Sequence, residues 1–532
     1  MPLLFLLLAC QTSDAPSTEG VVTVDTAGSE SDTGDGEDSG VPAGPEIVGA
    51  MLESPDPSVH LARRLRVDTD VATTLVVRID DGVSARRVGF PGAATGHEVP
   101  VLGLPADHEI SVSVLVTDAD GHTTELALPP FRTERMPDRF PQMEAFAHDP
   151  DAMEPGYRMV NLRTADDTLD WLVVLDRSLR LVWLREGQPN FGDVRMTERG
   201  TLVGLQEVVL EIDMLGEEVV RWDVGRTLHH ELFPLPGGGW LTLGYGDPVE
   251  VGDFPLDDAD PLGDRGPAMI RPDVLLELGP TGTVESELSL VDVLDVGRIG
   301  FGSLDVVGAG PLYDWSHANG VIALDDGSRI LSVCHQGAVL KLDPQNEVQW
   351  ILADPAGWSA AFAPLLLEPV GDVSWPYCQH APEWTDDGLL VLFDNHNDGH
   401  TPYTPAPAEQ PASRGIAYRI DEASGTVEVA WEIPAPGYLF SAALGDADVL
   451  PETGNVLLDF GFLEAEDGVS NFRAGRGKRS IRLVEAHPDR PEQPVLDLSL
   501  WGNFVDEPGG YRAFRSEHLP SLYADEVTVV FE

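Results

Sequence analysis

The sequence predicts an all-β protein, a six-bladed β-propeller preceded by a small β-sandwich and a disordered N-terminal tether. Two observations predict the propeller: a tryptophan that recurs near the end of a four-strand unit, and a histidine that recurs near the start of the unit. Helical periodicity is nearly absent from the chain, whereas short apolar segments separated by Gly, Asp and Pro turns are frequent, as strands require.

The tryptophan repeat sets the period. LVWL around Trp183, VVRW at Trp222, EVQW at Trp350 and EVAW at Trp431 share a hydrophobic-x-Trp signature. Trp183 and Trp222 lie about 40 residues apart, and Trp350 and Trp431 about twice that, which is the spacing of propeller blades. We interpret these tryptophans as packing residues between blades. Blades are expected to begin near residues 190, 230, 317, 380 and 445, and residues 157–184 are expected to join the C-terminal EVTVVFE segment in a sixth.

The histidine repeat points to a site. LHHELFPLPGGGWLTL contains His229 and His230, DWSHANGVIALDDGSRILSV contains His317, and YCQHAPEWTDDGLLVL contains His380. The first strand of every propeller blade lines the central channel, so equivalent positions in different blades converge. Three imidazoles at one place can bind anions, transfer protons or attack an electrophile.

The N-terminal segment predicts the cellular location of the protein. MPLLFLLLAC, residues 1–10, is too short to span a bilayer and ends in Leu7-Leu8-Ala9-Cys10, which resembles the lipobox of a bacterial lipoprotein signal peptide. An ordinary cleaved signal peptide is the alternative. Residues 11–44 are rich in acids, Ser, Thr and Gly and contain no base, so we expect a disordered linker. Together they predict an envelope lipoprotein anchored through Cys10, facing the periplasm or the exterior.

Residues 45–134 predict a separate domain, a small β-sandwich. RLRVDTD, TTLVVRID and HEISVSVLVTDADG alternate as strands do, and the last of them resembles the late strands of a fibronectin type III-like domain. Residues 135–532 would then form the propeller. The formal net charge of −57 argues against nucleic-acid partners and against charge-driven binding to anionic lipid. A membrane is therefore expected as a partner only through the lipid anchor, and the sequence does not predict the oligomeric state.

Several ordered motifs resemble the bacterial arylsulfotransferase family. They are HHELFPLPGGGWL, DWSHANGV, LSVCHQGAVLKLD, QHAPEWTDDGLLVLFDN, SRGIAYRID, LGDADVLPETGNVLLDFG and YRAFR. The resemblance implies a six-bladed propeller that moves a sulfuryl group from a phenolic sulfate ester to another phenol. It implies no cofactor, no metal and no nucleotide donor, small-molecule aryl sulfates and phenols as partners, and a histidine that carries the sulfuryl group.

The resemblance also assigns residues. His380, in the context Gln379-His380, matches the family's nucleophile, and His317 in Trp315-Ser316-His317-Ala318-Asn319 matches a second site histidine. The double histidine matches a third, with His230 favoured over His229 by its spacing to the following turn. His229, His335, Asn319 and Cys334 are accessory candidates. The family expects an arginine in a Ser-Arg-His-like segment, and Ser332-Val333-Cys334-His335 has Cys334 in that position, where His335 could partly replace the missing charge.

The two cysteines after Cys10 lie beside these histidines. Cys334 follows the His317 strand by one hairpin and Cys378 precedes His380. Because an envelope compartment is oxidising, we predict a Cys334–Cys378 disulfide, with two unrelated buried cysteines as the alternative.

Two other functions remain open on the sequence alone. The first is a non-catalytic binding propeller that has lost the family arginine. The second is a metal-dependent site built from His230, His317, His380, Cys334 and Cys378. The acidic run from Asp394 to Asp398 is interpreted as a turn between strands rather than as a metal loop.

Overall fold

The computed structural model describes residues 22–25, 44–164, 168–187, 191–205, 208–308, 310–408, 412–466, 469–470, 478–502 and 509–532. These residues form strands joined by turns, with 3-10 turns at Leu290–Asp292, Cys334–Gln336, Ala363–Leu365 and Pro436–Tyr438. The all-β prediction is confirmed. In the described part of the chain, no helix has the length and apolar character needed to cross a bilayer.

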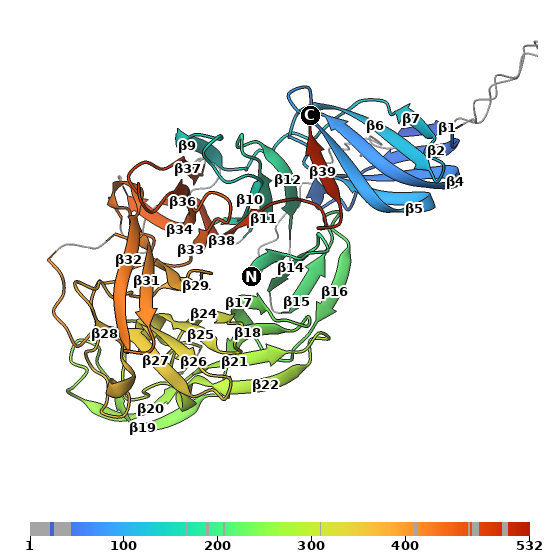
Figure 1. Cartoon of the computed structure of the whole chain (residues 1–532). Helices are drawn as coiled ribbons and strands as arrows, with labels where there is room; N and C mark the ends of the chain where they lie inside the picture. Colours follow the sequence, from blue (N-terminus) through green and yellow to red (C-terminus); the bar gives the residue numbers. More distant parts are fainter. Residues whose placement is uncertain are drawn as a thin grey trace, which may run out of the picture.

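Six sheets follow one another in chain order around a central axis, which is the architecture of a β-propeller (Figure 1). In each of them four strands pair in an antiparallel meander from an innermost to an outer strand. Two of the sheets are the group β13 (Val194–Met196), β14 (Leu202–Leu205), β15 (Val209–Ile212), β16 (Glu218–Trp222) and the group β17 (Leu228–Pro234), β18 (Trp240–Tyr245), β21 (Asp273–Leu278), β22 (Val284–Ser289).

The next sheets continue the same pattern. The third sheet contains β24 (Ala318–Ala323), β25 (Arg329–Val333), β26 (Ala338–Leu342) and β27 (Val348–Ala353). The fourth contains β29 (His380–Trp384), β30 (Leu389–Asp394), β31 (Arg414–Asp421) and β32 (Thr426–Pro434), with β28 (Glu368–Pro369) at its edge. The fifth contains β33 (Asp446–Val449), β34 (Val456–Glu466), β36 (Lys478–Ala486) and β37 (Leu496–Trp501), with β9 (Gln142–His148) at its edge and β35 (Val469–Ser470) beside β34. Each innermost strand begins near the residue that the sequence predicted.

The sheet that closes the ring joins distant parts of the chain. It contains β38 (Tyr511–Leu519), β10 (Tyr157–Thr164), β11 (Asp170–Leu175), β12 (Leu181–Glu186) and the short β3 (Val59–His60). Our expectation that the EVTVVFE segment closes the propeller is therefore wrong. The strand that closes the ring is β38, which pairs antiparallel with the largely buried strand β10.

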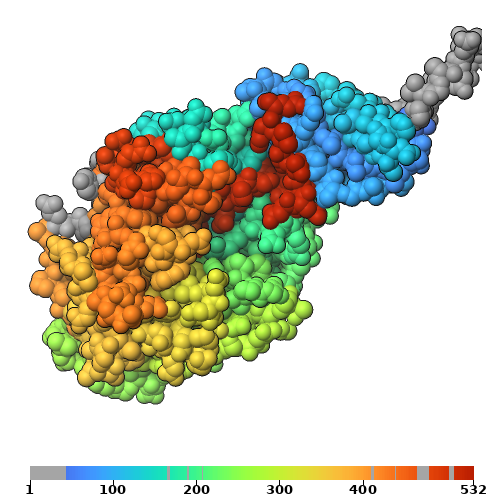
Figure 2. Space-filling view, in the orientation of Figure 1, coloured from blue at the N-terminus to red at the C-terminus, as the bar shows by residue number. Residues whose placement is uncertain are grey.

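The EVTVVFE segment instead crosses to the N-terminal domain. Its strand β39 (Thr528–Phe531) pairs with β5, and Figure 2 shows these last residues lying over the boundary between the two domains. The other strands of that domain are β2 (Ile47–Glu53), β4 (Arg63–Asp80), β5 (Ala85–Val101), β6 (Glu109–Asp118), β7 (Thr123–Ala127) and β8 (Phe131–Arg132). Glu532 adds ion pairs of 2.9 Å to Arg78 and 2.7 Å to Arg87.

Our expectation of a disordered linker over residues 11–44 is wrong at residues 22–25, where β1 (Val22–Asp25) pairs with β2. The rest of the linker up to residue 43 and the signal segment with Cys10 lie outside the described residues, so both stay predictions. The sequence did not predict an additional small sheet made of β19 (Val249–Pro255) and β20 (Arg265–Ile270), which lie between β18 and β21 in the chain, and β23 (Leu312–Tyr313), which lies between β22 and β24.

The hydrophobic cores lie between neighbouring blades. One cluster, for example, joins Val391 and Phe393 of β30 to Leu458 and Phe460 of β34. The repeated tryptophans lie on outer strands, as predicted: Trp183 and Trp350 are buried, and Trp222 and Trp431 pack against neighbouring clusters. Packing of this kind fixes each innermost strand relative to the next, and these strands carry the candidate site.

Candidate active site

The three predicted site histidines meet at the channel. The ring centre of His230 lies 5.1 Å from that of His317 and 6.1 Å from that of His380. Each side chain comes from the innermost strand, or the residue before it, of a different blade: β17, β24 and β29. The convergence expected from the repeat is therefore present in the structure.

The same local irregularity starts all three strands. The pairing register of β17 shifts between His229 and Leu232, that of β24 between Ala318 and Gly320, and that of β29 between His380 and Glu383. A bulge of this kind turns a side chain away from the regular alternation of a strand.

The backbone at these bulges is also unusual. His230 and His317 have φ angles of 62° and 46°, and Ala381 after His380 has 48°. Left-handed backbone is costly for residues other than glycine and tends to occur at functional sites.

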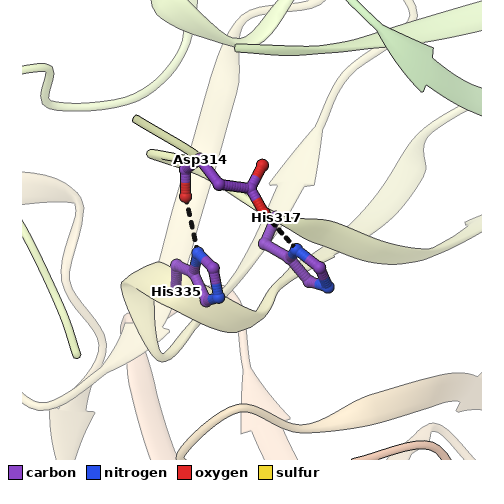
Figure 3. A group of neighbouring side chains, drawn as sticks. All are labelled: Asp314, His317 and His335. Atoms are coloured by element: carbon purple, nitrogen blue, oxygen red, sulfur yellow. Dashed lines mark hydrogen bonds and ion pairs between the residues drawn. The ribbon is translucent and has the colours of Figure 1, made fainter. Parts of the chain in front are cut away.

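Asp314 holds His317 in a defined orientation. Its carboxylate lies 2.7 Å from Nδ1 of His317 and 2.9 Å from the guanidinium of Arg271. Figure 3 shows that the same residue also binds His335, whose Nδ1 lies 2.6 Å from the backbone oxygen of Asp314. Since both Nδ1 atoms face oxygens of Asp314, the Nε2 atoms of the two rings are the ones left for other contacts.

The surroundings shift the histidine pKa values in opposite directions. Burial lowers the pKa of His380 to about 3, and burial together with the neighbouring histidines lowers that of His230 well below its ordinary value. Burial also opposes protonation of His317, but the hydrogen bond and charge of Asp314 outweigh it and raise the pKa of His317. Opposed shifts within one site separate a group that stays neutral from one that carries a proton.

His380 is enclosed by oxygen atoms on one side of its ring. Its Nδ1 lies 2.6 Å from Oδ1 of Asn395 and 3.2 Å from the backbone oxygen of Cys378. The ring is 3% exposed and Asn395 is fully buried.

The accessory candidates His229 and Asn319 differ in how they relate to the channel histidines. His229 lies behind His230, with the two Nδ1 atoms 2.9 Å apart and its Nε2 3.1 Å from Asp273. Asn319 is fully buried and donates to the backbone oxygen of Gln379, so it supports the strand that carries His380 rather than lining the channel.

His335 lies beside His317, with 4.5 Å between the ring centres. Burial, followed by the charge of His317, lowers the pKa of His335 to about 4. Our expectation that His335 replaces the charge of the missing arginine is therefore wrong, because the ring is neutral at neutral pH. The guanidinium of Arg271, bound to Asp314, is the permanent cation of this group.

Cys334 and Cys378 form a disulfide, and their Cα atoms are 3.8 Å apart. Cys334 begins the turn that carries His335, and Cys378 lies two residues before His380. The bond therefore joins the blades that present two of the site histidines. It also occupies both thiols, so the metal site that we considered from three histidines and two cysteines is not assembled.

Among the described residues, the side chains spaced closely enough to share a metal ion are Asp314, His317 and His335, whose potential ligand atoms lie within 4.8 Å of one another. Here both Nδ1 atoms are already hydrogen-bonded to Asp314, and the two rings stack at an interplanar angle of 25°. Stacked rings direct their remaining Nε2 lone pairs side by side rather than toward one point, so this arrangement does not favour a metal.

A cavity of about 620 Å³ adjoins His229 and His230. Aromatic and apolar side chains form much of its wall, and Arg163 and Arg512 also line it; the aromatic ones are Phe191, Tyr245 and Phe514. Its size is typical of a small-molecule site.

A second, smaller cavity lies further along the same innermost strands. Its volume is about 160 Å³ and its wall is rich in carboxylates: Glu231, Glu383, Asp446, Asp448 and Glu517. Arg515 also lines this cavity and pairs with Glu231 at 2.9 Å and Asp193 at 3.2 Å. Arg515 is thus part of a buried ion-pair network between blades. Arg414 instead pairs within its own blade, with Asp394 of the neighbouring strand at 2.9 Å.

Fold and site together describe a β-propeller with a histidine cluster in its channel. The family model of the arylsulfotransferases (ASST) matches residues 144–495. This chain belongs to the arylsulfotransferase family.

Two curated relatives carry the name arylsulfate sulfotransferase AssT. The protein from Escherichia coli O6:H1 is 29% identical over 320 residues, which are 50% of this chain and 51% of the relative. The protein from Lelliottia amnigena is 37% identical over 147 residues, 24% of each chain. The chain thus spans about half the length of the first relative and about a quarter of the second.

The solved structures to which the chain shows a distant similarity include a protein of unknown function from Bacteroides caccae, with 12% identity, a TM-score of 0.39, and coverage of 68% of this chain and 98% of that one. A streptogramin B lyase has 10% identity, a TM-score of 0.29, and coverage of 68% and 98%.

Sequence reasoning missed Asp314, Asp273 and Asn395, which orient the site histidines. Asp314 lies three residues before His317 in the DWSHANGV motif, and this short spacing is the sequence signal that could have identified Asp314 as the partner of His317. Asn395 lies in the run that we interpreted as a turn, and only the structure places it against His380.

Proposed function

We propose that this protein transfers a sulfuryl group from a phenolic sulfate ester to a phenolic acceptor, through a sulfohistidine intermediate on His380 and without a nucleotide donor. The observation that carries the proposal is the separation of roles among the three converging histidines. His380 is buried with a pKa lowered to about 3, whereas the hydrogen bond and charge of Asp314 raise the pKa of His317 and favour its protonated form. A nucleophile and an acid are the two groups that cleavage of an aryl sulfate requires.

In the first half-reaction, Nε2 of His380 attacks the sulfur atom. A nitrogen–sulfur bond forms as the bond between sulfur and the aryl oxygen breaks, and the electron pair leaves with the aryl oxygen. The imidazolium of His317 donates its Nε2 proton to that oxygen, so the donor departs as a neutral phenol. His230 would contact the sulfuryl oxygens, a role supported by the 5.1 Å between its ring centre and that of His317.

The second half-reaction reverses these steps on another phenol. The acceptor oxygen attacks sulfur, the nitrogen–sulfur bond breaks, and the acceptor proton passes to His317. Both histidines return to their starting protonation states, so the cycle needs no cofactor. The cavity of about 620 Å³ with its aromatic wall would hold the phenyl ring.

The test measures 4-nitrophenol release from 4-nitrophenyl sulfate with and without a phenol acceptor. We expect release that depends on the acceptor, loss of release in His380→Ala with an unchanged circular dichroism spectrum, and a labelled sulfuryl group on the His380 peptide after rapid quenching. Release without an acceptor would indicate a sulfatase instead. A folded protein that releases nothing would indicate a binding propeller, and label on another residue would refute the assignment of His380.

We also propose that the chain is an envelope lipoprotein anchored through Cys10. This rests on Leu7-Leu8-Ala9-Cys10 and on the acidic linker that follows. A lipid chain on Cys10 would leave the propeller at the membrane surface, connected by that linker.

A further inference from the structure

We propose that Asn395 is a positioning residue that fixes the neutral tautomer of His380 with the proton on Nδ1 and the lone pair on Nε2. The inference rests on the proposed function only for its kinetic consequence. Its structural content concerns one side chain and one ring. Asn395 follows directly after the last residue of β30, in the blade whose innermost strand begins with His380.

The amide of Asn395 has only one orientation that satisfies its neighbours. Its Nδ2 donates to the backbone oxygens of Ser441 at 2.8 Å and Leu444 at 2.9 Å. Both partners are carbonyls and can only accept, so the amide nitrogen must face them. The amide oxygen then faces His380, where it stands 2.6 Å from Nδ1.

An oxygen facing Nδ1 requires a proton between the two atoms. A second acceptor, the backbone oxygen of Cys378, lies 3.2 Å from the same nitrogen. If Nδ1 carried a lone pair, it would oppose two oxygen atoms in a buried setting, which is unfavourable. Two independent acceptors thus place the proton on Nδ1, and the neutral ring carries its lone pair on Nε2.

A buried network keeps the amide in place. Ser413 donates from its hydroxyl to the backbone oxygen of Asn395 at 2.9 Å, and it accepts from the backbone N–H of Ser441 at 2.8 Å. Asn395, Ser413 and Ser441 are fully buried. The acceptor at Leu444 depends on a left-handed backbone at Leu444 and at Gly445, where a Cβ would approach the ring of Phe393 to 2.4 Å.

This arrangement favours the covalent intermediate over the resting enzyme. When Nε2 bonds to sulfur, the ring becomes positively charged and its Nδ1–H becomes a stronger donor. Hydrogen bonds to a charged donor are roughly twice as strong as neutral ones. Asn395 therefore stabilises a state that forms during the reaction more than the ground state.

The chain offers a matched control for the kinetic test. Asn397 lies two residues further along the same loop, and its Nδ2 donates to the backbone oxygen of Ala442 at 3.0 Å. Asn395 and Asn397 both connect this loop to the segment 441–444, but only Asn395 contacts His380. We expect Asn395→Ala to lower kcat by about 100-fold or more, with KM changed only a few-fold. Asn397→Ala should retain kcat within a few-fold, and equal losses in the two variants would overturn the proposal.

Asn395→Asp separates positioning from a purely structural role. A buried carboxylate beside His380 should raise the pKa of the ring, since an opposite charge favours the protonated form. A protonated ring has no lone pair, so the acid limb of the kcat/KM profile should move to higher pH than in the wild type. An unmoved acid limb in a folded variant would count against the inference.

Nitrogen-15 spectra of histidine-labelled protein test the tautomer without any turnover. The His380 signals are identified by their loss in His380→Ala. We expect a protonated Nδ1 and a free Nε2 in the wild type at pH 7, and a mixture of tautomers in Asn395→Ala. A wild-type His380 with its proton on Nε2 overturns the proposal even if both Asn395 variants misfold. This result does not depend on whether the protein transfers sulfuryl groups.

Discussion

Glu383 offers a quantitative test of the electrostatics of the channel. It lies on β29, three residues after His380, and its carboxylate lines the small acidic cavity with Asp446, Asp448 and Glu517. Burial raises the pKa of Glu383 from 4.5 to about 7, against a hydrogen bond from the backbone N–H of Val449 at 2.9 Å. The expected effect of Glu383→Gln follows from this shift.

The sign and size of the effect depend on pH. Below pH 4.5 the carboxyl is protonated in both the folded and the unfolded chain, and ionisation costs nothing. As the pH rises from 4.5 through about 7, the unfolded chain loses this proton first, so the free energy of unfolding falls. At 1.36 kcal/mol per pH unit, the full loss is about 3 kcal/mol. A glutamine keeps an oxygen for Val449 and removes the ionisation.

Melting temperatures measured by intrinsic fluorescence from pH 4.5 to 8 provide the assay. Glu383→Gln should melt close to the wild type at pH 4.5 and several degrees higher at pH 8. Asp387→Asn is the control, because Asp387 is exposed in the turn that follows the same strand and the substitution removes an equal charge. A difference between Glu383→Gln and wild type that does not grow with pH would refute the reasoning, as would an equal gain in the control.

Three further predictions address the site and the anchor. Asp314→Asn removes the charge that raises the pKa of His317, so the alkaline limb of the kcat/KM profile should move to lower pH; a limb that stays in place would contradict the acid role. Replacing Cys334 and Cys378 together by serine should lower stability by about 2–4 kcal/mol, seen as a lower melting temperature in non-reducing buffer, and an unchanged melting temperature would show that the disulfide does not stabilise the fold. Cys10→Ser should release the protein from the membrane fraction, and wild-type protein that is already soluble would exclude the anchor.

The blades were predictable from sequence because their signals are local and repeated. A tryptophan near the outer strand and a histidine near the inner strand recur with a period that no other fold explains as simply. The convergence of His230, His317 and His380 followed from that repeat alone. The orienting residues did not follow, because Asn395 and Asp273 reach their histidines through tertiary contacts between elements that are separate in the sequence.

The closing strand was assigned incorrectly for a related reason. Both EVTVVFE and the segment Tyr511–Leu519 form strands, and the local sequence pattern does not decide which partner strand each of them takes. The structure assigns the first to β5 and the second to β10. The prediction that His335 carries a positive charge was wrong because the residue type indicates only the ordinary pKa of histidine. Burial lowers the pKa of this particular ring, and burial is not visible in the sequence.

The two strands that lie late in the sequence also determine when the domains can fold. Asn161 of β10 binds Phe514 of β38 across 353 residues, and Arg78 of β4 pairs with Glu532 across 454 residues. Contacts between such distant residues form slowly, because closing a long loop costs conformational entropy and no stabilising contact forms until its ends meet. Neither the ring of blades nor the N-terminal sheet is complete until residues 511–531 are present. Folding intermediates would therefore keep the edges of β5 and β10 unpaired, and these edges are where misassociation between copies would begin.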